Sequence, residues 1–550
     1  MTHDVLNQVP PLVGFDGMDY PVFQEALTRA GAANALESLH EIGQAAGSAQ
    51  AFALGDRAEA HPPVLHTHDR FGYRVDQVAY DPSYHELMTT ATRFGLHGTP
   101  WLSDDANAHL VRAVGLSLWG AVDAGHQCPI TMTYAAVPAL REDAELASRY
   151  VDKLGARGYD PSFRASEEKT FITAGMSMTE KQGGSDVRAN TTTAVAQSDG
   201  TYLINGHKWF TSAPMSDIFL TLANTPAGVT CFVLPRVLPD GTVNGLRLQR
   251  LKQKLGNHSN ASSEVEYINA VGWRLGDEGR GVPTIIRMVN ATRLDCALGS
   301  ASSMRVGTQM AVHHAIHRHA FGKALIDQPL MRNVLADLAI EAEAATSTAL
   351  WLASLTDRST AGDDGAERLR RIGIAVTKYY VCKRAPIHAA EALECFGGNG
   401  YIEDSRMPRL YREAPLMSIW EGSGNVAALD TLRAAAKQPE TVAALMAELD
   451  EARGRDERYD AFIDGLGSAF DDPDTIQLRA RRIVGDLAVA LQASQLLRHG
   501  HPAVAEAFVA SRLDGQHGDV FGTLPAGLDL APILERATLK GSGDAEEFIA

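Results

Sequence analysis

The spacing of apolar residues changes twice along this chain, and those two changes limit what it can fold into. From about residue 173 to 280, short runs such as GTYLINGHKWFTSA and GVTCFVLPR are rich in β-branched and aromatic residues. Turn signals, Asn205-Gly206 among them, separate these runs, which is typical of a β-domain. On both sides of it apolar residues recur at helical spacing, as in HLVRAVGLSLWGAVDAG. The pattern predicts a multidomain α+β fold.

The same changes suggest where the domains begin and end. Long helical patterns at about 282–320, 329–357 and 364–396, with another beginning near Gly424, predict a helical bundle. The Ala- and Leu-rich segment after it predicts further helices. A length of 550 residues also favours several domains, because single cores stop growing below that size. We predict an N-terminal helical domain (1–172), a β-domain (173–280), a helical bundle domain (281–437) and a C-terminal helical domain (438–550).

Composition excludes several classes of protein. A hydrophobic fraction of 45% with 21% charged residues is typical of a soluble globular chain. The chain contains no run of eighteen apolar residues, so no membrane span is predicted. The start of the chain does not resemble a signal peptide. The five cysteines are odd in number and form no CxxC pair, which favours a reducing compartment without disulfides. We therefore expect a cytoplasmic protein that does not associate with membranes.

Charge makes nucleic acid a disfavoured partner. The formal net charge is -17, whereas DNA-binding proteins usually present a basic domain or stripe. From residue 441 onward the chain has 19 acidic and 10 basic residues. Its basic cluster, LRARRIVGD (478–486), is explained more simply as a solvated helix face. DNA binding remains an alternative that the charge argues against.

Two motifs that suggest common sites lack the context those sites need. HHAIHRHAFG (313–322) places His313 and His317 one helical turn apart, but no Glu or Cys stands at ligand spacing. We expect a histidine-rich helix face and no metal site. GGNG (397–400) follows a helical pattern, so it predicts a helix C-cap and turn instead of a Rossmann phosphate loop.

Two other segments could contact a planar cofactor. In GMSMTEKQGGSDVRANTT (175–192), Thr179, Gly184 and Ser185 lie in a loop that offers hydroxyls and backbone N–H groups to a heterocycle or a phosphate. A plain interdomain loop is the alternative. In HKWFTSA (207–213), alternate residues of one strand would place Trp209 and Thr211 on the same face, suited to a flavin. A core tryptophan with a surface threonine is the ordinary alternative.

The segment SIWEGSGNVAALD (418–430) places a carboxylate between bulky and flexible residues. Glu421 follows Ile419-Trp420 and precedes Gly422-Ser423-Gly424. An apolar frame favours the neutral acid and raises its pKa, which suits a proton acceptor near neutral pH. A solvated glutamate in a surface loop is the alternative.

Five segments in this order resemble the acyl-CoA dehydrogenase flavoproteins: MTEKQGGSD, KWFTS, RHAFGKALIDQPLMRNVLADL, CFGGNGYIED and WEGSGN. CPITMTYAAVPAL and LKQKLGNHSNASSEVEY are similar to the AidB (adaptive response to alkylation) branch of that family. The resemblance covers residues 5–435 well and the tail more loosely. It implies an N-terminal α-helical domain, a central β-barrel-like domain, a C-terminal four-helix bundle and an extra C-terminal helical domain, with FAD bound between domains.

The resemblance also implies a reaction, α,β-dehydrogenation of an acyl-CoA thioester. Glu421 matches the catalytic base that takes the pro-R α-proton, while the β-hydrogen leaves as hydride to flavin N5. Arg293 and Gly422 match substrate-binding positions. Some members place the base one residue before that arginine, but Thr292 stands there and cannot act as a base. The electron acceptor would be an electron-transfer flavoprotein or, in an oxidase, oxygen. A FAD-containing DNA-protective protein with little dehydrogenase activity is the alternative.

Cofactor contacts carried over from the family fall in five places. They are Met178, Thr179, Gly184 and Ser185 in the loop; Trp209, Phe210 and Thr211 in the strand; Arg318, Phe321 and Gln328, which reach the FAD of a neighbouring subunit; Glu394, Gly397 and Gly398 near the adenosine; and Ser423 and Asn425 after the base. The third group implies a homo-oligomer, usually a tetramer. Lys181, Glu394 and Asn425 depart from the common pattern, which puts the adenosine contacts and the substrate profile in question.

Overall fold

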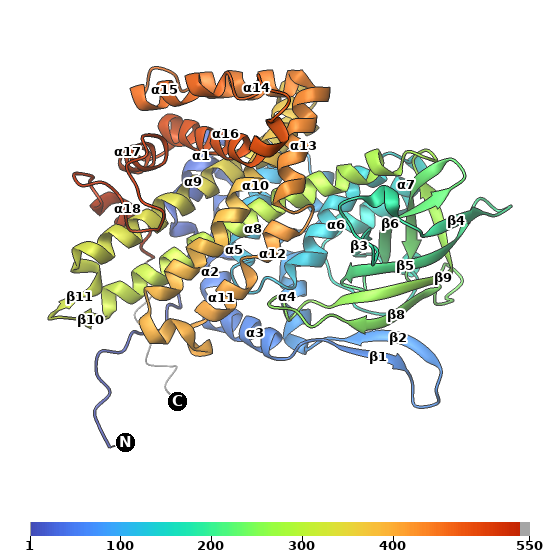
Figure 1. The fold of residues 1–550 in the computed structure, drawn as a ribbon. Coiled ribbons are helices and arrows are strands. Elements are labelled where there is room, and N and C mark those ends of the chain that lie inside the picture. Colours follow the sequence, from blue (N-terminus) through green and yellow to red (C-terminus); the bar gives the residue numbers. More distant parts are fainter. Residues whose placement is uncertain (1, 540–550) are drawn as a thin grey trace. The chain divides into compact units, whose positions relative to one another are not determined.

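The chain forms two units whose segments alternate along the sequence. The computed structural model describes residues 2–539, shown in Figure 1. The first unit comprises residues 1–49, 109–121 and 293–550, and we call it the helical unit. The second comprises residues 50–108 and 122–292, and we call it the β unit. Each is described separately below.

Seven strands form the centre of the β unit (Figure 1). The pairing follows the order β3-β6-β4-β5-β9-β7, and β6 also pairs with β7, so five of these strands close into a ring. Closure removes the exposed edges of an open sheet and makes this part barrel-like. Its core contains Phe219, Phe232 and Val265. The strands are β3 (Ala174–Ser177), β4 (Thr193–Ala196), β5 (Tyr202–Ser212), β6 (Ile218–Thr225), β7 (Gly228–Pro235), β8 (Leu246–Leu251) and β9 (Ser262–Leu275).

The β unit also contains a hairpin that the sequence pattern did not predict. Strands β1 (Val64–His68) and β2 (Arg74–Ala79) pair antiparallel within a region expected to be mainly helical. The two strands have five and six residues and are largely exposed, so too few apolar positions alternate to distinguish a strand from a loop. The main helices of this unit are α3 (Ala49–Ala60), α4 (Pro82–Arg93), α6 (Gln127–Leu140) and α7 (Ala144–Gly155).

Long helices form the core of the helical unit. They are α8 (Gly281–His317, of which residues 293–317 belong here), α9 (Pro329–Thr360), α10 (Asp364–Glu394) and α13 (Gly424–Lys437). Figure 1 shows α9 and α10 running side by side. Ala301, Ala342 and Ala385 lie in the buried cluster between these helices, and such small side chains let helix backbones approach closely. The bounds agree closely with the helical patterns in the sequence. Shorter helices are α1 (Pro21–Ala30), α2 (Leu36–Gly47), α5 (Ala108–Trp119), α11 (Met407–Glu413) and α12 (Leu416–Ile419).

The tail adds further helices to the same unit. They are α14 (Pro439–Asp450), α15 (Glu457–Leu466), α16 (Ile476–His499), α17 (Pro502–Phe508) and α18 (Ala531–Arg536). Helix α16 packs on α9, α10 and α13. No helix within residues 2–539 is long and apolar enough to cross a membrane. The division into four domains at residues 172, 280 and 437 stays a prediction.

Candidate active site

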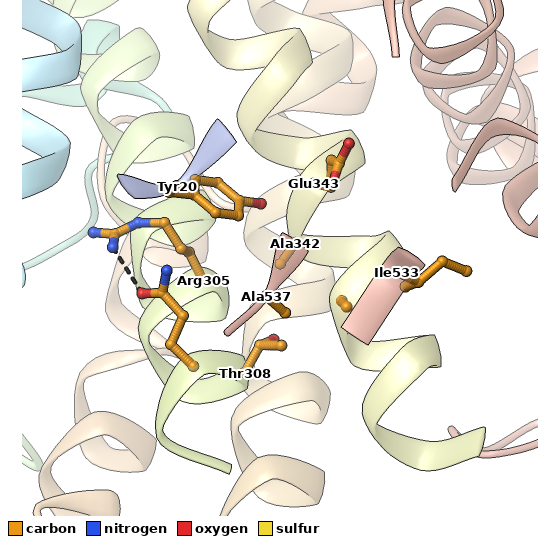
Figure 2. Close-up of a pocket in the computed structure, with 9 residues that line it drawn as sticks. Tyr20, Arg305, Thr308, Ala342, Glu343, Ile533 and Ala537 are labelled. Atoms are coloured by element: carbon orange, nitrogen blue, oxygen red, sulfur yellow. Dashed lines mark hydrogen bonds between the residues drawn. The ribbon is translucent and has the colours of Figure 1, made fainter. Parts of the chain in front are cut away.

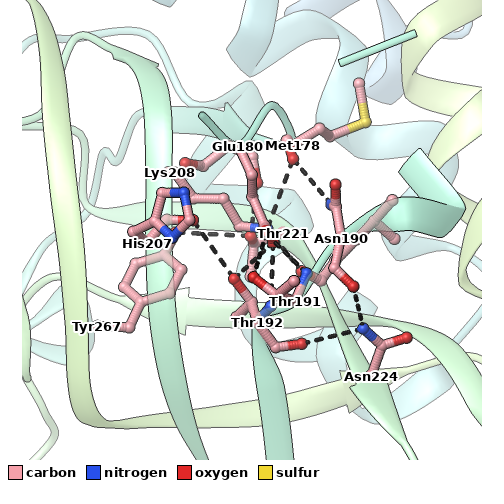
Figure 3. A network of polar contacts seen from close by, with 12 residues as sticks. Met178, Glu180, Asn190, Thr191, Thr192, His207, Lys208, Thr221, Asn224 and Tyr267 are labelled. Atoms are coloured by element: carbon pink, nitrogen blue, oxygen red, sulfur yellow. Dashed lines mark hydrogen bonds and ion pairs between the residues drawn. The ribbon is translucent and has the colours of Figure 1, made fainter. Parts of the chain in front are cut away.

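The loop that follows β3 is anchored from within the β unit by a buried ion pair (Figure 3). The Oε1 atom of Glu180 lies 3.0 Å from Nζ of Lys208, and neither side chain is exposed to solvent. Thr191 and Thr192 donate both their amides and their hydroxyls to the Glu180 carboxylate, at 2.6–3.2 Å. Burial alone would raise the pKa of Glu180, but the Thr191 amide, the Thr192 hydroxyl and the Lys208 ammonium together hold that pKa well below its usual range. The carboxylate therefore stays ionised.

This anchor fixes the backbone of the loop. The carbonyl of Met178 accepts a hydrogen bond from Nδ2 of Asn190 at 3.0 Å, and that of Thr179 accepts one from the Trp209 amide at 2.8 Å. The amide of Gly183 donates to the Glu180 carbonyl at 3.0 Å and closes a tight turn. Within the described chain, the hydroxyls of Thr179 and Ser185 and the amides of Gly184 and Ser185 have no protein hydrogen-bond partner. These donors are thus available to a ligand.

Glycine is required where the turn closes on itself. A Cβ atom placed on Gly184 would lie 2.3 Å from Oγ1 of Thr179, well inside contact distance. The threonine side chain fills the space that any larger residue would need. The loop therefore holds a hydroxyl directly against a backbone segment with free N–H groups, a cradle suited to an acceptor-rich ligand.

Strand β5 contains a bulge that changes the expected arrangement of its side chains. Lys208 pairs with Val265 and Thr211 pairs with Ser263, so the bulged strand has one residue more than its partner between these pairs. The regular alternation from which we predicted a shared face for Trp209 and Thr211 is therefore interrupted. Thr211 is buried and its Oγ1 lies 2.5 Å from Oγ of Ser177.

Trp209 lies in a cationic and aromatic setting. Its indole is half-buried, and the neighbouring Phe210 is 50% exposed. The Nζ atom of Lys252 stands 3.2 Å from the centroid of the indole, and the same ammonium pairs with Glu264 at 2.6 Å. A cation over one face fixes the ring plane through a cation–π contact. The contact of Trp209 with a flavin stays a prediction.

In the helical unit, Glu421 occupies a strained turn between α12 and α13. Its φ is +58°, which is rare for a residue with a side chain, and Gly422 follows with φ +100°. Ile419 is 62% exposed, so it does not supply the apolar frame that we expected before the carboxylate. Trp420 is half-buried. The predicted rise in the pKa of Glu421 stays a prediction.

Arg293 joins α8 to this turn. Its Nε donates to the Glu421 carbonyl at 2.9 Å, and its Nη1 pairs with Asp430 of α13 at 2.7 Å. Arg371 of α10 pairs with the same aspartate at 3.0 Å. Arg293 is buried and lies next to Gly422, whose added Cβ would be 3.5 Å from Nη2. The structure thus brings together Glu421, Gly422 and Arg293.

The remaining predicted cofactor residues lie on exposed parts of the helical unit. Strands β10 (His319–Ala320) and β11 (Lys323–Ala324) form a short hairpin whose tip residue, Phe321, is 98% exposed. Arg318 donates to the Asn7 carbonyl, and Nε2 of Gln328 donates to the Ala320 carbonyl at 3.1 Å. Four residues are exposed after α10 or at the start of α13: Gly397, Gly398, Ser423 and Asn425. Glu394 is also exposed.

Sequence patterns gave no indication of two basic residues near the Glu421 turn. Arg481, from tail helix α16, donates through Nε to Oδ1 of Asn425 at 2.9 Å. Lys378 of α10 donates to the carbonyls on either side of Glu421. Both positions belong to helical patterns in which charged residues usually face solvent, so no sequence signal distinguishes them.

A cavity elsewhere in the helical unit is too small for a substrate. It lies between α8, α9 and α18 and is lined by Tyr20, Arg305 and Glu343 among others (Figure 2). Its volume of about 10 Å³ accommodates one water molecule. Nε of Arg305 and Nε2 of Gln309 lack hydrogen-bond partners among residues 2–539, and a water molecule would satisfy both.

Comparisons with known proteins identify the family. The model of the adaptive response protein AidB N-terminal domain matches residues 7–161. The models of the middle and C-terminal domains of acyl-CoA dehydrogenases match residues 175–270 and 279–436. The chain is 42% identical over 521 residues to the putative acyl-CoA dehydrogenase AidB of Escherichia coli, covering 94% of this chain and 95% of that protein. This chain belongs to the acyl-CoA dehydrogenase family.

Solved structures agree with that assignment. The crystal structure of Caenorhabditis elegans ACDH-11 in complex with C11-CoA superposes with a TM-score of 0.86 at 27% identity, covering 93% of each chain. An acyl-CoA dehydrogenase complexed with FAD from Bacillus anthracis shares the fold, with a TM-score of 0.60 at 19% identity over 78% of this chain and 77% of that one. The predicted acyl-CoA dehydrogenase fold is confirmed.

Membership makes this acyl-CoA dehydrogenase an FAD-dependent oxidoreductase, and the residues present fit FAD. The Gly184 cradle offers hydroxyl and N–H donors of the kind that flavin and phosphate oxygens accept. The rigid indole of Trp209 offers an aromatic surface in the same unit. Which individual residues contact the cofactor stays a prediction.

Proposed function

We propose that this acyl-CoA dehydrogenase uses Glu421 to remove the α-proton of an acyl-CoA thioester. FAD supplies the hydride acceptor for the β-hydrogen when it is bound. The observation that carries the proposal is the turn at Glu421, where a non-glycine residue with φ +58° has its carbonyl fixed by buried Arg293. Strain of this kind persists where the surrounding structure enforces it, and it is concentrated at functional sites.

The turn at Glu421 also offers backbone N–H donors to a substrate. The amides of Gly422 and Ser423 have no backbone acceptor within the described residues. Proton removal from a thioester builds charge on its oxygen, and preorganised N–H donors stabilise such charge. We assign to Gly422 this contact with substrate, and to Arg293 the positioning of the turn.

The substrate class follows from relatives. A C. elegans structure of this fold is a complex with C11-CoA. We extend acyl-CoA as substrate to this chain, with an electron-transfer flavoprotein or oxygen as the electron acceptor.

Anaerobic addition of an acyl-CoA panel to the FAD-loaded protein tests this substrate class, since a substrate bleaches the flavin. Absence of bleaching with every chain length would favour the alternative, a FAD-containing DNA-protective protein, whose DNA complex should be weak and salt-sensitive at a net charge of -17.

The variant Glu421→Gln tests the base directly. An amide has a similar shape but is not basic near neutral pH, so flavin reduction should slow by at least about 10²–10⁴-fold. FAD content and the spectral shift on acyl-CoA binding should remain. Stopped-flow absorbance under anaerobic conditions measures both. Glu440→Gln, an exposed glutamate of α14, is the matched control. A near-normal rate for Glu421→Gln would end the assignment.

We also propose that the chain assembles with copies of itself by burying the hairpin at Phe321. Support comes from the 98% exposure of Phe321 and the 82% exposure of Leu330, since large apolar residues are seldom so exposed unless a partner covers them. The family resemblance favours a tetramer. Light scattering on FAD-loaded protein should give an oligomer mass. A monomer that holds FAD at full occupancy would contradict the proposal.

A further inference from the structure

The turn that carries Glu421 rests on a buried lysine of α10. Lys378 is 1% exposed, one of the largest side chains with almost no solvent contact. Its Nζ donates to the Ser418 carbonyl at 3.4 Å and to the Gly422 carbonyl. Those carbonyls lie three residues before and one residue after Glu421. One ammonium therefore connects the end of α12 to the turn that follows it.

No acid accounts for the burial of this charge. Other buried lysines of the chain have carboxylate partners: Lys208 pairs with Glu180 at 3.0 Å and Lys169 with Asp217 at 2.6 Å. For Lys378, no ion pair with a carboxylate occurs in the described part of the chain. Moving an ammonium out of water is unfavourable unless other groups compensate for the lost hydration. The compensation here comes from the carbonyls beside Glu421.

The turn needs such support because its conformation is unfavourable. Glu421 and Gly422 are successive residues with positive φ. A non-glycine residue persists in this region only where the surrounding structure enforces it. Arg293 fixes the carbonyl of Glu421, and Lys378 fixes the carbonyls on either side. Three backbone carbonyls of a five-residue segment, residues 418–422, are thus held by two buried cations.

The ammonium and the carboxylate also share a neighbourhood. Cys296 of α8 is buried, and burial raises the pKa of its thiol. Among the charges that act on that thiol, Lys378 lowers its pKa and Glu421 raises it. Both charges therefore lie close to the same side chain.

We infer that Lys378 is a positioning residue for the catalytic base: it holds the backbone on both sides of Glu421 so that the strained turn presents the carboxylate to the substrate. The inference rests on the proposed function of Glu421. A purely structural lysine, which only caps α12, would affect the stability of the fold and leave proton transfer unchanged in the folded enzyme. The two roles differ in the rate of reduction at saturating acyl-CoA.

The variant Lys378→Met tests this in the FAD-loaded full-length protein. Methionine fills similar space without donors, so the turn should relax and the carboxylate should move. Misplacement of a reacting group by about 1 Å can cost about 10²-fold in rate, and we expect a loss of that order in anaerobic flavin reduction at saturation. The affinity for acyl-CoA, read from the flavin spectral shift, should change little. Backbone amides 419–423 should exchange hydrogen faster than in the wild type.

A neighbour on the same helix gives a matched control. Thr377 is also 1% exposed, and its hydroxyl makes no hydrogen bond to any residue that the structure describes. Thr377→Val changes the same buried layer without touching the turn, so its reduction rate should equal that of the wild type. Lys378→Gln, a milder polar replacement, provides a second test if the methionine variant folds poorly. It should also reduce the flavin more slowly than the wild type.

The outcomes separate the inference from the proposed function. A wild-type reduction rate in FAD-loaded Lys378→Met or Lys378→Gln would overturn the inference, whatever Glu421→Gln shows. Loss of FAD from both lysine variants, with Thr377→Val unaffected, would assign Lys378 a structural role and would overturn it too. A wild-type rate in Glu421→Gln would instead remove the proposed base.

Discussion

At the scale of single residues, buried charges fix the backbone of two predicted site segments, one within each unit. Glu180 and Lys208 fix the loop in the β unit, while Arg293 and Lys378 fix the turn in the helical unit. Buried ions seldom add net stability, because desolvation offsets their attraction, but removing one partner leaves the other uncompensated. Each of these four side chains is bonded to the backbone of the loop or turn that it fixes. The charges therefore specify conformation more than they stabilise the fold.

Replacing Glu180 should show this directly. Glu180→Gln leaves Lys208 buried without a carboxylate, and we expect a loss of about 3–5 kcal/mol in the free energy of unfolding at pH 7. Urea unfolding followed by circular dichroism measures it. Glu266→Gln, an exposed glutamate of β9, is the control and should cost less than about 1 kcal/mol. An equal effect of the two variants would contradict the anchor.

The pH dependence of that difference has a definite sign. The folded pKa of Glu180 lies well below its unfolded value of about 4.3, so its contribution is fully present above that pH. It is lost as the pH falls through the folded pKa. The stability gap between wild type and Glu180→Gln should therefore be constant from pH 7 to about 5 and shrink below about pH 4. A gap that widens on acidification would contradict this account.

At the scale of elements, long regular segments could be predicted from the sequence, and irregular ones could not. Helices α9 and α10 begin where their apolar periodicity begins, at Pro329 and Asp364. The hairpin β1–β2 is too short and exposed to leave a pattern. The bulge in β5 adds one residue relative to β9, and this extra residue can be recognised only once the pairing of the two strands is known. The local spacing of apolar residues predicts the long helices. Short or bulged strands depend on the strands with which they pair, and local spacing does not show that pairing.

The residues of the candidate site likewise include some that the sequence predicts and some that it does not. The sequence predicts its motif residues because five short segments occur in the family order, and Glu421 with its glycines is among them. Lys378 and Arg481 were missed because contacts between helices distant in sequence bring them to the turn. Adjacency in sequence alone predicts that Ile419 frames the carboxylate, but its 62% exposure shows that adjacency does not determine where a side chain points.

The loop after β3 gives a prediction at this scale. Gly184→Ala would place a methyl group 2.3 Å from Oγ1 of Thr179, so the loop must open. We expect FAD binding to weaken by at least about tenfold, since 1.4 kcal/mol of lost contact suffices for that factor. Gly200→Ala, in the β4–β5 turn with φ +85° and open space around it, should cost about 1 kcal/mol of stability and leave FAD binding unchanged. Release of flavin fluorescence measures the affinity. Unchanged FAD affinity in Gly184→Ala would remove this loop from the cofactor site.

At the scale of the whole molecule, the tail is tied to the bundle by buried ion pairs. Arg512 reaches Asp337 at 2.6 Å and Glu341 at 2.8 Å on α9, and Arg384 of α10 pairs with Glu341 at 3.0 Å. All three of Asp337, Glu341 and Arg512 are nearly inaccessible to solvent. Tail and bundle therefore share one charged core within the helical unit. We expect them to unfold together even though the sequence pattern divides them at residue 437.

Arg512→Met tests that expectation. Burial raises the pKa of Glu341, but Arg384 and Arg512 outweigh it and lower the pKa to about 2. The folded value lies below the unfolded one, so this carboxylate stabilises the protein above about pH 4.3 and ceases to do so as the pH falls towards 2. Removing Arg512 leaves Asp337 without its cation and should cost about 3–5 kcal/mol at neutral pH. It should also raise the pKa of Glu341 and move acid unfolding to higher pH.

The measurement distinguishes a shared core from an independent tail. Far-ultraviolet circular dichroism reports all helices, and flavin fluorescence reports release of the cofactor. If tail and bundle form one cooperative unit, Arg512→Met lowers both transitions by the same amount. If the tail unfolds alone, circular dichroism shows a separate early transition while the flavin signal keeps its wild-type midpoint. Arg482→Met, whose side chain on α16 is 86% exposed, should leave both signals unchanged because exposed ion pairs contribute little.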